Sequence, residues 1–176
     1  GHVRAELSLA APARFTLRFR VPAWAAGFEA SLNGAPLPRD TQNGYLVIDG
    51  TFRDGDEIKI DFSMPTRFLT ANGHIPDCAG KTALMRGPLV YCLEETDNGG
   101  QLWNCAVDAS APARDALGQM PDGAIAIECE GVRETTGGAL YDDRAPARTP
   151  VKLIFAPYYL WGNRGAGDMT VWVRRR

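Results

Sequence analysis

Two adjacent pairs of acidic residues are the first candidates for catalytic carboxylates in this sequence. They are Glu94-Glu95 and Asp142-Asp143. Hydrolysis of a glycosidic bond uses two carboxylates held a defined distance apart across a cleft. Neighbouring side chains on a strand point to opposite faces, so an adjacent pair rarely converges on one substrate atom. We therefore interpret both pairs as solvated charges at strand ends.

Histidine offers one further candidate, because His74 lies close before Cys78 in the sequence. A cysteine–histidine pair can act as nucleophile and base when a third group orients the histidine. No such third group is evident, and the segment has the composition of a linker. The sequence also lacks a Gly-x-Ser-x-Gly, P-loop or dinucleotide-binding motif. We expect no catalytic residue, no metal ligand and no cofactor in this chain.

Cysteine spacing argues against a structural zinc site. The four cysteines are Cys78, Cys92, Cys105 and Cys129, and none forms a C-x-x-C motif. Cys92 and Cys129 lie in apolar stretches, where cysteine behaves as a small core residue. We predict free thiols rather than disulfides, which favours a reducing, cytoplasmic compartment.

Aromatic side chains are the remaining candidates for a binding role. The most suggestive group is Tyr159, Trp161, Asn163 and Arg164 on a glycine-containing loop, and Trp103 is a further candidate. Flat rings beside polar groups could hold a sugar. The same rings could instead fill the core or pack on a neighbouring domain, since aromatic residues are prominent in both settings. Both alternatives stay open from the residues alone.

Composition excludes several classes of protein. The chain has 176 residues, a net charge of −2, 45% hydrophobic and 23% charged residues, which is typical of a globular protein rather than a disordered one. No basic stripe is present, which argues against nucleic acid or an anionic membrane as partner. No apolar run approaches the roughly 18 residues that a membrane-spanning helix needs.

Apolar and polar residues alternate with period two along most of the chain, which is typical of half-buried strands. Asn33-Gly34 is a strong hairpin signal. The best helical candidate, residues 111–120, is interrupted by Pro112 and Gly118. We predict an all-β fold, a β-sandwich of jelly-roll-like or Greek-key antiparallel sheets. The predicted strands cover residues 3–9, 15–21, 28–32, 45–49, 58–62, 81–86, 88–94, 124–130, 151–155 and 168–174.

Turn-forming residues crowd residues 64–80, and we place a domain boundary near residue 75. Residues 1–75 are then predicted to form one β-sandwich unit. Residues 76–176 are predicted to form a second β-sandwich unit with longer loops.

Several sequence blocks, taken in order, resemble a known family. They are residues 15–24 (FTLRFRVPAW), 31–34 (SLNG), 83–95 (ALMRGPLVYCLEE) and 157–165 (PYYLWGNRG). The order and content of these blocks resemble the C-terminal part of glycoside hydrolase family 127, the bacterial β-L-arabinofuranosidase family. The resemblance extends over nearly the whole chain.

The resemblance implies that the catalytic machinery lies outside this chain. Members of that family look like an (α/α)₆ barrel that carries the active site, followed by β-sandwich domains. A cysteine nucleophile, an acid/base glutamate and a zinc ion held by cysteines and a glutamate all belong to the barrel. No cysteine here lies in a matching motif, so no catalytic or metal-binding residue is carried over, and Cys92 is not expected to be the nucleophile.

The chain is therefore expected to be a non-catalytic C-terminal β-sandwich region that docks on and stabilises the barrel of its parent chain. The alternative is a carbohydrate-binding module for arabinose-containing glycans. Without the barrel, the exposed docking face could also support a homodimer.

Overall fold

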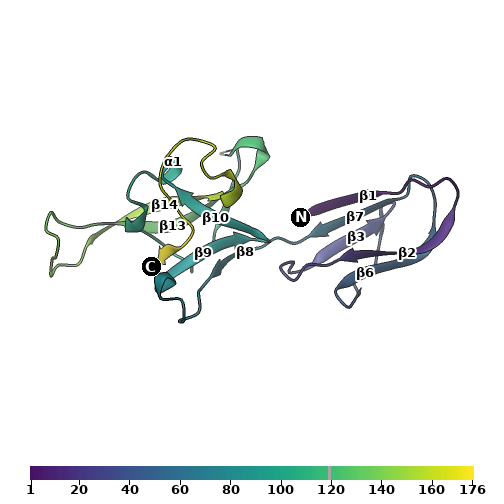
Figure 1. Cartoon of the computed structure of the whole chain (residues 1–176), viewed down its shortest axis with the longest axis horizontal. Helices are drawn as coiled ribbons and strands as arrows, with labels where there is room; N and C mark the ends of the chain where they lie inside the picture. Colours follow the sequence, from purple (N-terminus) through teal and green to yellow (C-terminus); the bar gives the residue numbers. More distant parts are fainter. Residues whose placement is uncertain (119) are drawn as a thin grey trace. The chain divides into compact units, whose positions relative to one another are not determined.

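The computed structural model describes residues 1–118 and 120–176 and divides the chain into two compact units, Gly1–Pro65 and Thr66–Arg176 (Figure 1). The division lies earlier than the predicted position near residue 75. The reason is β8 (Thr66–Leu69), which the sequence analysis assigned to the boundary segment. It pairs with β9 (Lys81–Arg86) and so is part of the second unit.

The first unit consists of two antiparallel sheets. One has four strands in the order β1-β7-β3-β4, and the other has three in the order β2-β6-β5. Both sheets contribute side chains to a shared core, which includes Ile58 and Ile60 from the first sheet and Leu46 and Phe52 from the second. The strands are β1 (His2–Glu6), β2 (Ala13–Arg20), β3 (Phe28–Leu32), β4 (Ala35–Pro36), β5 (Thr41–Gln42), β6 (Tyr45–Phe52) and β7 (Glu57–Phe62).

Two Asn-Gly hairpin turns set the register of this unit. Asn33 and Gly34 have φ of 50° and 80°, and they connect β3 to β4 as the sequence predicts. Asn43 and Gly44 have φ of 51° and 78° and connect β5 to β6 in the same way. Positive φ at both central residues matches the right-handed twist of the paired strands, and Asn-Gly tolerates it best. The second turn was not singled out from the sequence.

The second unit contains the remaining strands and all the helical turns. The short strands β11 and β12 were not predicted. The best helical candidate, residues 111–120, contains β12 instead of a helix, and its residue 119 lies outside the described residues. The strands not yet given are β10 (Leu89–Glu94), β11 (Cys105–Val107), β12 (Arg114–Ala116), β13 (Ala126–Thr135), β14 (Ala147–Pro157), β15 (Met169–Thr170) and β16 (Val173–Arg175). The helical turns are η1 (Pro76–Cys78), α1 (Glu95–Asn98), η2 (Leu102–Asn104), η3 (Pro121–Gly123) and η4 (Tyr158–Leu160).

Strand pairing in the second unit forms a closed circuit. The path runs β10-β14-β13-β11-β16-β9, and β9 pairs back to β10 through a hairpin whose turn is Gly87-Pro88. Gly87 has φ of 54°, which suits the first central position of a type II′ turn. Side chains of β10, β13 and β14 form the core, including Leu93, Ile127 and Phe155. The predicted all-β, sandwich-like fold is confirmed.

A close backbone approach fixes Gly131 inside this core. A Cβ atom built on Gly131 would lie 2.7 Å from the Ala106 carbonyl oxygen and 2.7 Å from Leu153 Cδ1. Gly131 lies on β13, which pairs with β11 on one side and β14 on the other. The neighbouring backbone cannot yield without breaking this pairing, so the position requires glycine.

We expect Gly131→Ala to lower the free energy of unfolding of the second unit by about 2 kcal/mol, because overpacking strains the β11–β13–β14 ladder. Thermal denaturation followed by circular dichroism measures the loss. Gly73→Ala is the control, since a Cβ there meets nothing within 4 Å. Equal stability of the two variants would contradict the role assigned to Gly131.

Candidate functional site

An exposed group of three aromatic residues follows the end of β14. Tyr158, Tyr159 and Trp161 lie on or beside η4 and are 45%, 58% and 48% exposed. The rings of Tyr158 and Trp161 are stacked, with centroids 6.2 Å apart and planes inclined by 22°. We call these three residues the aromatic surface. It presents large apolar rings to solvent on a short, defined turn.

The turn that carries the aromatic surface is anchored from within. Leu160 is only 6% exposed and packs in a small cluster with Ala126 and Ala156. The Trp161 amide donates to the Tyr158 carbonyl at 3.0 Å, and the Asn163 amide donates to the Leu160 carbonyl at 3.1 Å. One buried leucine thus holds its aromatic neighbours outward.

A second anchor is an ion-pair group centred on Arg164. Its guanidinium donates to both carboxylate oxygens of Asp97 at 2.7 and 2.6 Å and lies 3.2 Å from Glu94. The side chains of Arg164 and Asp97 are 16% exposed and that of Glu94 is 4% exposed. The hydrogen bonds to Asp97, reinforced by Glu94, raise the pKa of Arg164 above its ordinary value. The loop after η4 is thereby tied to α1 and to the end of β10.

This arrangement changes the interpretation of two sequence candidates. Arg164 was grouped with residues that bind sugar or face the barrel, but its guanidinium is committed to Asp97 and Glu94. It acts as a positioning residue for the loop. The interpretation of Glu94 as a solvated charge is wrong, because Glu94 is buried and faces Arg164. The sequence did not reveal this pair, because Glu94 and Arg164 are far apart in the chain. The pairing of β10 with β14 brings them together.

The other candidates separate into two places. Tyr159 and Trp161 share the aromatic surface, with Asn163 exposed on the following turn. Trp103 instead lines a different hollow, together with Trp172. Tyr158 was not among the candidate site residues, although its position next to Tyr159 was a usable signal.

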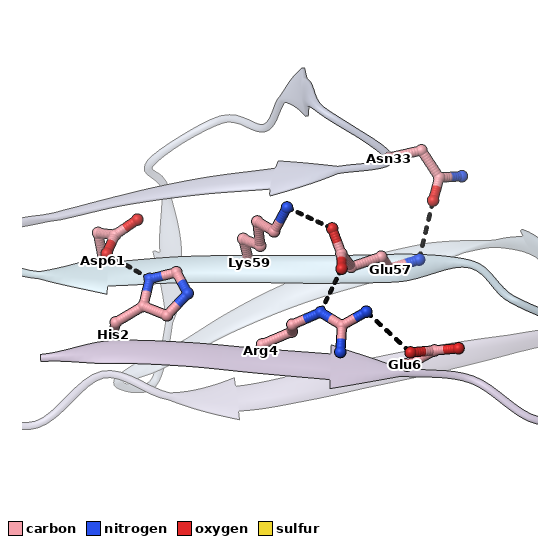
Figure 2. Close-up of polar contacts among 7 residues, drawn as sticks. All are labelled: His2, Arg4, Glu6, Asn33, Glu57, Lys59 and Asp61. Carbon is pink, nitrogen blue, oxygen red and sulfur yellow. Dashed lines mark hydrogen bonds and ion pairs between the residues drawn. The ribbon is translucent and has the colours of Figure 1, made fainter.

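The outward face of the first unit carries a network of exposed ion pairs (Figure 2). Strand register places Arg4 opposite Lys59 and Glu6 opposite Glu57, so like charges face each other. Diagonal contacts between opposite charges offset this repulsion, because Glu57 accepts a hydrogen bond from Arg4 and lies 2.5 Å from Lys59. Hydrogen bonds from Lys59 and Arg4 lower the pKa of Glu57. A carboxylate held ionised in this way is unsuited to act as a general acid.

Three of the four cysteines are buried as free thiols. Burial, reinforced for Cys92 by the Glu94 carboxylate and for Cys129 by Glu128, raises the pKa of each thiol to about 12. Burial also raises the pKa of Cys105. Across residues 1–118 and 120–176, no three His, Cys, Asp or Glu side chains are grouped to hold a metal ion. In the same residues, no helix is long and apolar enough to cross a membrane.

Comparison with known proteins decides the family. Residues 66–174 match the model of the glycoside hydrolase family 127 C-terminal domain. Residues 1–64 match the model of the β-L-arabinofuranosidase, GH127 middle domain. The chain belongs to glycoside hydrolase family 127. The resemblance drawn from the sequence is confirmed, and the two matched regions meet where the two structural units meet.

Relatives of this family 127 chain are considerably longer. The non-reducing end β-L-arabinofuranosidase of Bifidobacterium longum is 35% identical over 99% of the chain, which covers 29% of that protein. A GH127 β-L-arabinofuranosidase structure from Geobacillus stearothermophilus T6 is 36% identical, with a TM-score of 0.87 over 100% of this chain and 29% of its own. A further glycoside hydrolase structure is 30% identical with a TM-score of 0.84. The chain thus corresponds to the middle and C-terminal domains of longer enzymes.

Removing the Arg164 side chain tests the anchor of the aromatic surface. We expect Arg164→Ala to lower the free energy of unfolding by about 3–5 kcal/mol, because Glu94 then stays buried without its partner. Chemical denaturation measures this. Arg39→Ala removes an exposed pair with Glu29, whose side chains are 70% and 76% exposed, and should cost less than about 0.5 kcal/mol. Equal losses in the two variants would contradict the assignment.

Thiol labelling tests whether any cysteine is activated. At pH 8 the native chain should react rapidly with a disulfide reagent at Cys78 alone, because this thiol is partly exposed and the other three are buried. Denaturant should release the remaining thiols. Cys78→Ser should abolish the rapid phase. A rapid phase that persists in this variant would show an accessible thiolate and contradict the inert role of the buried cysteines.

Proposed function

We propose that this chain is the non-catalytic accessory region of a longer glycoside hydrolase, and that it docks on and stabilises the catalytic barrel of the same protein. The observation that carries the proposal is the aromatic surface. Tyr158 and Trp161 are stacked, exposed and held on a turn that Leu160 and Arg164 anchor from below. Rigid aromatic rings are typical anchors of domain and subunit interfaces.

The length relation supports this proposal. Relatives with similar middle and C-terminal domains are enzymes of which this region is 29%, and interfaces between domains of one chain bury roughly 600–1,500 Å². Among the described residues, the buried thiols of Cys92, Cys105 and Cys129 and the Glu94 carboxylate, which faces Arg164, offer no competing catalytic centre. We infer that hydrolysis belongs to the rest of the longer protein.

A carbohydrate-binding role for arabinose-containing glycans is a second candidate. The observation that favours it is the same pair of exposed, nearly parallel rings, because flat aromatic faces also stack on sugars. The two roles differ in what they require. Docking needs the aromatic surface to be covered in the longer protein, whereas glycan binding needs it to remain open.

The docking proposal predicts that one substitution affects the longer protein but not the 176-residue chain. Trp161→Ala should leave the melting temperature of the 176-residue chain nearly unchanged, because the ring is about half exposed. In the longer protein it should lower the melting temperature by a few degrees, which corresponds to about 2 kcal/mol for a central interface tryptophan. Differential scanning calorimetry of both proteins measures this.

Tyr141→Ala is the matched control, since Tyr141 is 94% exposed between β13 and β14, and it should change neither protein. An unchanged longer protein together with lost retention on arabinan would favour the glycan-binding role. If concentration-dependent dimers of the 176-residue chain disappear in Trp161→Ala, the exposed docking face also mediates self-association.

A further inference from the structure

The hollow that Trp103 lines lies in the second unit, and its lining does not include the aromatic surface. It has a volume of about 290 Å³ and is lined by two indole rings, Trp103 and Trp172, with Met169, Lys81 and Asp168. We call it the Trp103 pocket. Pockets for small ligands are typically about 300–1,000 Å³, mostly apolar and furnished with a few polar groups. This pocket is slightly smaller than that range.

The loop that carries Trp103 holds the indole in the open. Gln101 adopts a left-handed conformation with φ of 59° and ψ of 52° immediately before η2. Leu102 is buried at 2% exposure, whereas Trp103 is 62% exposed. Strained backbone of this kind costs of order 1 kcal/mol and persists where the surroundings enforce it. Here it directs Leu102 inward and leaves the next ring in solvent.

Arg133 of β13 enforces this loop conformation. Its guanidinium donates to the carbonyl oxygen of Gly100 at 2.6 Å and also to that of Asn98. A side chain of the core sheet thus holds the backbone just before Gln101. The backbone that carries Trp103 is therefore held in place without a ligand, which reduces the entropy lost on binding.

The opposite wall is equally fixed. The Thr170 hydroxyl donates to the Trp172 carbonyl at 3.0 Å, which closes the turn between β15 and β16. The Asp168 amide donates to Glu95 Oε2 at 3.0 Å. These contacts use the backbone of the wall and leave the Asp168 carboxylate uncommitted.

Within residues 1–118 and 120–176, two charged groups that line the pocket form no side-chain hydrogen bond or ion pair. They are the Asp168 carboxylate and the Lys81 ammonium. Arg174, which also lines the pocket, is already paired with Glu134 at 2.6 Å. The pocket therefore combines an exposed indole face with one free hydrogen-bond acceptor and one free donor.

We propose that the Trp103 pocket binds a single neutral sugar ring. The apolar C–H face of the ring packs on the Trp103 indole, one or two hydroxyls donate to Asp168, and another accepts from Lys81. A hydroxylated ring matches this lining because each hydroxyl both donates and accepts, and its C–H face suits the indole. The small volume favours one ring over a longer oligosaccharide in the pocket. The site is separate from the proposed docking function and does not depend on it.

The test is titration of the 176-residue chain with L-arabinose, D-xylose and D-galactose, followed by tryptophan fluorescence and calorimetry. We expect saturable binding of at least one sugar in the millimolar range. Trp103→Ala should weaken it by at least tenfold, and Asp168→Asn by several-fold. Trp103→Phe should retain part of the affinity, because a flat ring remains. Circular dichroism should show that each variant keeps the native fold.

Tyr141→Ala is the control, since Tyr141 is 94% exposed between β13 and β14 and does not line the pocket, and it should leave sugar affinity unchanged. Absence of a saturable response to all three sugars up to about 100 mM would overturn the proposal. Binding that survives Trp103→Ala but is lost in Trp161→Ala would also overturn it and would place sugar at the aromatic surface. Saturable binding of glycine or lysine in place of sugars would show that the two charges serve a zwitterionic ligand and overturn the assignment. None of these outcomes depends on whether the longer protein needs Trp161 for stability.

Discussion

Strand β10 is hydrogen-bonded to three other strands, and both exposed sites of the second unit depend on it. Leu89 and Val90 pair with β9, the segment from Tyr91 to Leu93 pairs with β14, and Leu93 and Glu94 pair with β15. The strand closes the circuit of pairing and ends at the buried carboxylate of Glu94. Its end thus fixes the Arg164 loop, while its last pairing positions the wall of the Trp103 pocket.

Charge burial explains what holds the loop after η4 in place. Glu94 at 4% side-chain exposure would be costly without a cation, and Arg164 supplies it while binding Asp97 with both nitrogens. In the first unit, the ion pairs around Glu57 are mostly exposed, so each contributes little to stability. Ion pairs between carboxylates and basic side chains therefore stabilise the fold of the second unit. In the first unit they lie at the surface and contribute little to stability.

Much of the fold could be predicted from local sequence, and the misses have a common cause. Long alternating strands such as β2 and β6 were anticipated, and so was the turn at Asn33-Gly34. The short strands β8, β11 and β12 were missed because three or four residues carry too little periodicity. They become strands through pairing with distant partners. Because β8 was missed, the domain boundary was predicted near residue 75, whereas the structure divides the chain after Pro65.

The sequence by itself determined the family, the all-β class and the aromatic residues that are candidates for recognition. Local patterns carry this information, because period-two alternation and turn chemistry act over a few residues. Only the tertiary structure decided that Trp103 lies apart from the aromatic surface, that Arg164 positions a loop, and that Glu94 is buried. Those facts depend on contacts between residues far apart in the chain, since the Arg164–Asp97 bond spans 67 positions. Strand pairing in the sheet brings such residues together, and local sequence patterns do not predict these contacts.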